Sequence, residues 1–103
     1  MPDNNNLAGN NKVKNKAIAE AANILKALAN SNRLQVLYLI AEEELSVGYI
    51  EKAVKLSQSA LSQHLAVLRS YDIVQTRRAA QTIYYKLKDE KVRKIMELLR
   101  DLY

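Results

Sequence analysis

The chain has no cysteine, a single histidine and only two glycines among its 103 residues. Without cysteine it can form neither a disulfide nor a thiolate metal site. With so few glycines it also lacks a glycine-rich phosphate-binding loop. These absences make an enzyme the weakest of the function classes that we consider. We expect no catalytic residue, no metal site and no cofactor.

Long apolar runs are also missing. No stretch approaches the roughly 18 residues of a membrane span, and the first residues lack the basic start and apolar core of a signal peptide. We therefore expect a cytoplasmic protein without a membrane partner. Residues 1–11, MPDNNNLAGNN, have little to bury and are predicted to be a disordered tail, which leaves residues 12–103 as one domain.

The positive charge is concentrated in one part of the chain. The formal net charge is +5, and the segment from Lys55 to Lys88 accounts for all of it, because its only acidic residue is Asp72. A local excess of this kind is typical of a surface that binds a polyanion such as DNA. A solvated basic face without a partner is the alternative.

Helical periodicity runs through the first two thirds of the sequence. A first helix is predicted over residues 12–29, and Ser31 is the expected N-cap of a second. Ser46 can cap a short third helix that ends near Val54, and Ser57 can cap a fourth. Two helices joined by so short a turn form a helix-turn-helix, whose second helix lies in the DNA major groove.

The periodicity changes after the fourth helix. The segments IVQTRR and TIYYKL are rich in β-branched residues and tyrosine, and they flank the short tip AAQ, which predicts a β-hairpin. Neither Ala79 nor Ala80 favours a positive φ, so we expect a loop longer than two residues. A last helix, capped near Asp89, completes a mainly α fold with one small hairpin.

The fourth helix, LSQSALSQHLAVLRSY, has an apolar stripe of leucines and an opposite face of small neutral polar groups. Serine and glutamine form hydrogen bonds and let another surface come close, which suits contact with base edges. Gln63 can pair with adenine, Ser59 and Ser62 can meet bases or phosphates, and Gln58 is expected to hold a phosphate. His64 is expected to be a boundary side chain bonded to a neighbour or to phosphate.

The hairpin tip carries three further candidates. Arg77, Arg78 and Gln81 lie where a wing reaches the minor groove or the phosphate backbone. The predicted DNA-binding residues are therefore Gln58, Ser59, Ser62, Gln63, His64, Arg77, Arg78 and Gln81.

Taken in order, the segments LKALANSNRLQVL, ELSV, LSQSALSQHLAVLRSYDIVQTRR and YYKL resemble the ArsR/SmtB family of winged helix-turn-helix transcriptional repressors. The likeness is greatest to its HlyU/BigR-like branch. It implies a homodimer, built on the first and last helices, that binds an inverted repeat in promoter DNA. Both helices have more apolar positions than one modest core requires. The interface candidates are Ile18, Leu25, Ile95, Leu99 and Leu102.

The sensing residues of that family are not matched. Relatives that sense oxidants or sulfur join a cysteine of the second helix to one beyond the last helix, and this chain has Tyr38 at the first position. We expect either constitutive repression or relief by a small molecule near Tyr38. Arg33 lies in the first turn of the second helix, where a positive charge interacts unfavourably with the helix dipole. It is expected to contact a phosphate or form a surface salt bridge.

A second function class stays open at this point. A winged helix can also serve as a protein-interaction module, because the fold alone does not fix the function. The basic wing and the neutral polar helix favour DNA binding over that alternative.

Overall fold

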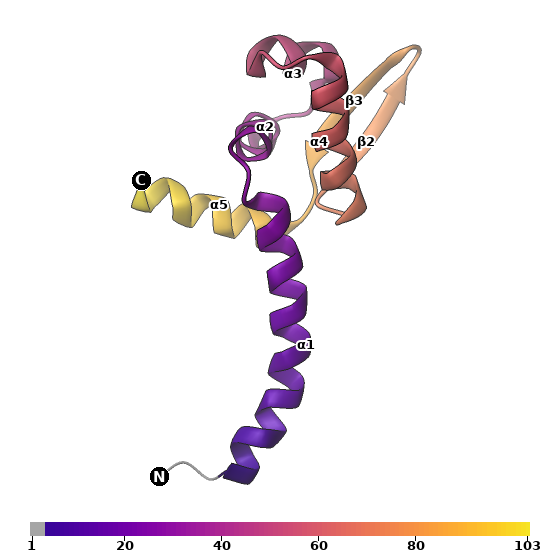
Figure 1. The fold of residues 1–103 in the computed structure, drawn as a ribbon. Coiled ribbons are helices and arrows are strands. Elements are labelled where there is room, and N and C mark those ends of the chain that lie inside the picture. The colour runs from indigo at the N-terminus through magenta and orange to yellow at the C-terminus, as the bar shows by residue number, and fades with distance from the viewer. Residues whose placement is uncertain (1–3) are drawn as a thin grey trace.

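The computed structural model describes the backbone of residues 4–103 and the side chains of residues 14–103 (Figure 1). The elements follow in the order α1 (Asn4–Leu28), α2 (Ser31–Glu42), β1 (Leu45–Ser46), α3 (Val47–Val54), α4 (Gln58–Ser70), β2 (Val74–Ala79), β3 (Thr82–Leu87) and α5 (Glu90–Leu102).

The first helix starts earlier than predicted. Because α1 begins at Asn4, residues 4–11 of the expected tail belong to the helix, and residues 1–3 lie outside the described residues. The predicted division into tail and domain stays a prediction. The expected cap of α2 was also wrong, because Asn30 rather than Ser31 accepts the backbone N–H groups of Asn32 and Arg33.

The helix-turn-helix agrees with the prediction. Ser46 caps α3 by accepting the N–H of Tyr49, and Ser57 caps α4 by accepting the N–H of Ala60. Between the two helices Lys55 adopts a left-handed conformation, with φ 56, and its N–H bonds the carbonyl of Glu51. This residue ends α3 and turns the chain into α4.

The sheet is antiparallel with the strand order β1-β3-β2. The two-residue strand β1 was not predicted, and it pairs Leu45 with Tyr85. The loop between β2 and β3 contradicts our expectation, because Ala79 pairs directly with Thr82 and only two residues intervene, with Ala80 at φ 55. The cross-strand register imposes this turn on a residue that does not favour it.

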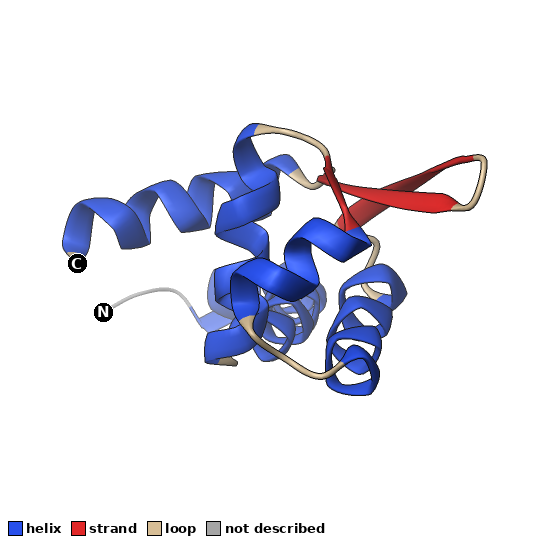
Figure 2. Cartoon of the chain, turned by 90° about the horizontal axis from the view of Figure 1, so that it is seen from above, coloured by secondary structure: helices blue, strands red, loops and turns tan. Residues whose placement is uncertain are grey.

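One core joins the helix-turn-helix, the sheet and the start of α5. Its largest fully buried side chains are Leu37, Ile40, Ile50, Leu61, Leu68, Ile73 and Met96. The hairpin projects from one side of this core and α5 from the other (Figure 2). The fold is the predicted winged helix-turn-helix.

Candidate functional site

Three faces of α4 have different surroundings. Leu61, Leu65 and Leu68 are buried in the core. Ser59 and Gln63 are exposed, on a stripe about 100° around the helix from Gln58 and Ser62. The polar face predicted from the sequence is therefore two stripes, and Ser59 and Gln63 form the outward one.

The other stripe lines a groove between α4 and the wing. The groove has a volume of about 600 Å³. Gln58, Ser62, Leu65 and Arg69 line it from α4, Ser46, Val47 and Gly48 from the start of α3, and Gln81, Thr82, Ile83 and Tyr85 from the wing. The structure thus brings Gln58, Ser62 and Gln81 together as parts of one surface.

Arg77 is held on the wing by two neighbours. Its Nε and Nη2 atoms donate to Oε1 of Glu44 at 2.9 and 2.6 Å, and its guanidinium lies 4.4 Å from the ring centroid of Tyr84. The ion pair lowers the pKa of Glu44 from its ordinary value of 4.5, chiefly through the hydrogen bond, and raises the pKa of Arg77. Arg77 is therefore exposed but already paired.

Arg78 lies on the other face of the hairpin. It pairs with Ile83 across the strands, and side chains alternate between the two faces of a sheet. Arg78 therefore shares the face of Ile83 and Tyr85, which line the groove. Neither Arg78 nor Arg69 has an acidic partner within ion-pair distance among residues 14–103.

His64 lies apart from the outward stripe. Its ring is half-buried, and Nδ1 lies 3.4 Å from Nη1 of Arg33 in α2. Arg33 forms none of the ion pairs found among residues 14–103, and its other bonds go to the carbonyls of Lys26 and Ala27. The expectation of a surface salt bridge for Arg33 was therefore wrong. His64 was expected to bond either a neighbour or a phosphate, and in the structure its neighbour is Arg33.

Two residues of this surface were missed by the sequence reasoning. Arg69 follows Gln58, Ser62 and Leu65 at helical spacing, a signal that would have placed it in the groove. Glu44 had no such signal, because it lies 33 residues from Arg77 in the chain.

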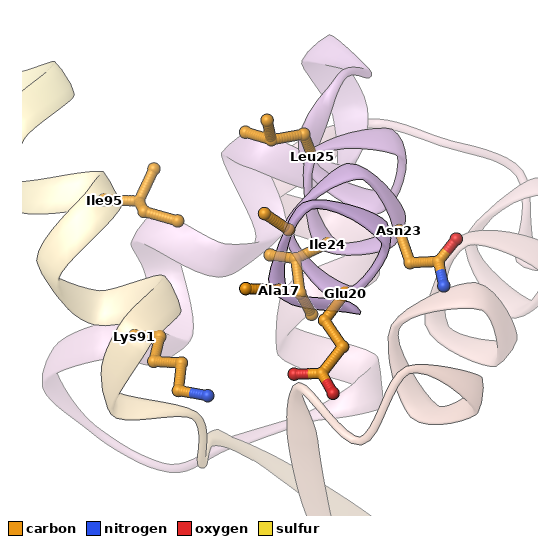
Figure 3. A pocket seen from close by; sticks show the side chains of 8 residues that line it. Ala17, Glu20, Asn23, Ile24, Leu25, Lys91 and Ile95 are labelled. Atoms are coloured by element: carbon orange, nitrogen blue, oxygen red, sulfur yellow. The ribbon is translucent and has the colours of Figure 1, made fainter. Parts of the chain in front are cut away.

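A second surface lies between α1 and α5 (Figure 3). An apolar hollow of about 490 Å³ is lined from α1 by Ala17, Glu20, Ala21, Asn23, Ile24 and Leu25, and from α5 by Lys91 and Ile95. Ile18, Leu25 and Leu102 are 61%, 53% and 65% exposed, while Ile95 and Leu99 are half-buried. Leu98, 56% exposed, belongs to the same apolar set and was not predicted.

Tyr38 joins α2 to α5. Its hydroxyl donates to the carbonyl of Met96 at 3.0 Å, and the Arg100 guanidinium lies 5.6 Å from its ring centroid. Arg93 of α5 also donates to the carbonyl of Ala41 at 2.6 Å. The polar end of Tyr38 is therefore used within the protein, and it lines neither of the two hollows described above.

The described residues contain neither a metal-binding cluster nor a membrane-spanning helix. There, no three His, Asp or Glu side chains gather closely enough to hold a metal ion. Within the same residues, no helix has the length and apolar character needed to cross a membrane.

Comparison with known proteins identifies the family. Residues 30–76 match the model of the bacterial regulatory proteins of the arsR family. The transcriptional activator HlyU of Vibrio cholerae is 50% identical over 88 residues, which cover 85% of this chain and 82% of HlyU. A structure of reduced HlyU superposes with a TM-score of 0.85 at 48% identity, covering 89% of this chain and 97% of that chain.

Two further relatives extend this result. The biofilm growth-associated repressor of Agrobacterium fabrum is 40% identical over 85% of this chain and 75% of its own length. A homodimeric winged helix-turn-helix DNA-binding domain from Mycobacterium bovis has a TM-score of 0.77 at 32% identity, covering 86% of this chain and 82% of that chain. These relatives are regulators rather than enzymes, and the chain belongs to the arsR family of bacterial regulatory proteins.

Proposed function

We propose that this protein is a homodimeric repressor that binds an inverted repeat in promoter DNA and reads its sequence with α4. The single observation that carries the proposal is the exposed, uncharged stripe of Ser59 and Gln63 beside the groove that Arg69 lines. Arg69 and Arg78, which shares a face with the groove residue Ile83, form no ion pair among residues 14–103. Neutral hydrogen-bonding groups suit base edges, and cations suit phosphates.

The two stripes of α4 have different roles in this proposal. Gln63 and Ser59 face the base edges, where the amide of Gln63 can bond adenine through two hydrogen bonds. The groove between α4 and the wing takes the phosphate backbone, with Gln58, Ser62 and Gln81 as hydrogen-bond donors. Arg69 and Arg78 supply the charge that neutralises it.

Arg77 and His64 contribute less directly. A phosphate could bind Arg77 only in exchange for Glu44 or beside it, because the pair is already formed. His64 can reach DNA only if its bond to Arg33 is given up. We therefore assign Arg77 a role in holding the wing in place, and His64 a role in holding α4 in place.

The dimer is proposed to form through α1 and α5. Every residue from 14 to 23 is exposed in the single chain, including the apolar Ala17, Ile18 and Ala21, so no other part of residues 14–103 covers this stretch of α1. The homodimeric relative from Mycobacterium bovis supports the same state here. Two copies of α4 would then lie about 34 Å apart, one turn of DNA.

Repression follows from occupancy of the promoter. The relatives include a protein named as an activator and one named as a repressor. We propose repression in the cytoplasm that needs no small-molecule effector at Tyr38, since Tyr38, the residue considered for an effector, is bonded to Met96.

Selection of bound duplexes from a random DNA library tests this proposal. Purified protein should enrich a sequence with two-fold symmetry, with half-sites about 10 base pairs apart from centre to centre. Failure to retain duplex DNA at moderate salt, or enrichment of a site without symmetry, would contradict it.

A further inference from the structure

A single guanidinium connects α4 to the end of α1. Arg33, in the first turn of α2, donates from Nε to the carbonyl of Ala27 at 2.5 Å and from Nη2 to the carbonyl of Lys26 at 3.0 Å. Its third nitrogen, Nη1, lies 3.4 Å from Nδ1 of His64 in α4. The carbonyls near the end of a helix lack intrahelical partners, so Arg33 satisfies the last turn of α1 while it contacts α4.

The contact with His64 depends on the charge of the imidazole. A guanidinium has donors only and does not lose its proton, so Nδ1 must accept, with the ring proton on Nε2. A protonated imidazole has donors on both nitrogens and a positive charge. It would therefore lose this hydrogen bond and face a like charge at the same distance.

Among residues 14–103, no carboxylate forms an ion pair with Arg33 or His64. Helix α4 contains no acidic residue, and the only charged side chains of β2, which packs against it, are Arg77 and Arg78. On α2 the one acid, Glu42, is at the opposite end from Arg33. On α1 the one acid, Glu20, comes six residues before Lys26, whose carbonyl Arg33 bonds. Asp72, which follows α4, is bonded to Lys88.

We propose that Arg33 and His64 are positioning residues that hold α4 against the end of α1, and that protonation of His64 releases α4 and weakens DNA binding. The effect on DNA rests on the function proposed above. Because α1 carries the dimer surface, the Arg33 contact sets the angle of each α4 within the dimer.

The sign of the pH effect separates this role from a direct contact with DNA. A protonated His64 bound to phosphate would strengthen binding as the pH falls. A His64 that positions α4 through Arg33 would weaken it. Because the chain has no cysteine and no second histidine, its other side chains ordinarily titrate outside about pH 5 to 8.

The first experiment measures affinity for the selected duplex from pH 8 to pH 5.5 at constant ionic strength, for the wild-type protein and for His64→Gln. Glutamine can accept from Arg33 but does not titrate, and both proteins have the same amino-terminal amine. We expect the wild-type affinity to fall about tenfold relative to that of His64→Gln, the scale of one hydrogen bond to a charged group. Arg33→Lys should bind more weakly at pH 8 and show a flatter pH profile, because lysine cannot bond all three partners.

The second experiment needs no DNA. An NMR titration can follow the one imidazole, the Nε–H of Arg33 and the backbone amides of α4. We expect all three to change with the same midpoint in the wild-type protein, and the α4 amides to stay unchanged over this range in His64→Gln. Circular dichroism at pH 8 verifies that each variant is folded.

Each outcome decides between the proposals. Parallel pH profiles for wild type and His64→Gln, or tighter wild-type binding at low pH, would overturn the positioning role. Arg33 and α4 signals that ignore the imidazole would overturn it even without DNA data. A protein that passes the NMR test but binds no duplex at pH 8 would contradict the proposed function and the claimed effect on DNA, while confirming the Arg33–His64 contact.

Discussion

The Glu44–Arg77 pair decides which arginine of the wing is free to meet a phosphate. Arg77 already has a carboxylate within 2.6 Å and an aromatic ring beneath it, whereas Arg78 has no acidic partner among residues 14–103. Each phosphate contact that is lost reduces the salt dependence of DNA binding by about one unit of slope.

We therefore predict different results for the two arginines. Arg78→Ala should weaken binding to every sequence and lower the slope of log K against log salt by about one. Arg77→Ala should change the slope less, because Arg77 is largely neutralised by Glu44. Fluorescence anisotropy of labelled duplex at several salt concentrations measures both slopes, and the reverse order would show that Arg77 exchanges Glu44 for a phosphate.

Gln63 is the residue expected to carry sequence specificity. Gln63→Ala should cost about 1 to 3 kcal/mol on the preferred site and relax the preference at one base pair, with little loss on random DNA. Gln58→Ala, in the groove, is the matched control and should weaken both DNAs alike. Equal losses on the preferred and random duplexes for Gln63→Ala would remove Gln63 from base recognition.

Among the helices and strands, features that depend on nearby residues could be predicted from the sequence, and features that depend on long-range contacts could not. The caps Ser46, Ser57 and Asp89 were predicted because a helix start depends on neighbours within three residues. Strand β1 was not, because two residues become a strand only by pairing with Tyr84 and Tyr85. The tight turn at Ala80 was missed for the same reason.

The candidate site also has features that local spacing predicts and features that depend on long-range contacts. The outward stripe of α4 follows from the helical period, so Ser59 and Gln63 could be found from spacing alone. The Arg33–His64 and Glu44–Arg77 contacts join residues 31 and 33 positions apart, and no local pattern marks them. Sequence reasoning therefore predicted the outward polar stripe of α4 but not the bonds that hold α4 and the wing in place.

The Glu44–Arg77 ion pair should make the stability of the fold depend on pH in the acid range. Because Arg77 lowers the pKa of Glu44 in the folded state, the pair stabilises the fold above about pH 4.5, and this contribution is lost as the pH falls through the lowered value. Glu44→Gln should thus lower the free energy of unfolding at pH 7 but not near pH 2. Urea unfolding of both proteins across this range measures the difference, and a constant difference would contradict the assignment.

The bond between α2 and α5 gives a separate prediction. Tyr38→Phe removes the hydroxyl that donates to the Met96 carbonyl and leaves the ring in place, so it should cost about 0.5 to 1.5 kcal/mol of stability. Thermal or urea unfolding measures this loss. Since the ring still packs, DNA affinity should change little, and an unchanged stability would mean that the bond contributes nothing.

In the whole molecule, we propose that two copies of α4 act together. The hollow between α1 and α5 shares no lining residue with the groove between α4 and the wing, so a dimer through α1 and α5 leaves both proposed DNA-binding surfaces free. A dimer of this kind reads two half-sites only when they lie on the same side of the duplex.

The most direct measurement compares the selected repeat with the same repeat carrying about five extra base pairs at its centre, half a turn of DNA. Mass measurement of the complex gives the stoichiometry. We predict that two chains bind the original repeat, and that affinity for the lengthened repeat falls to that of a single half-site. Equal affinity for the two duplexes, or one chain bound to the original repeat, would contradict a dimer that reads DNA with paired α4 helices.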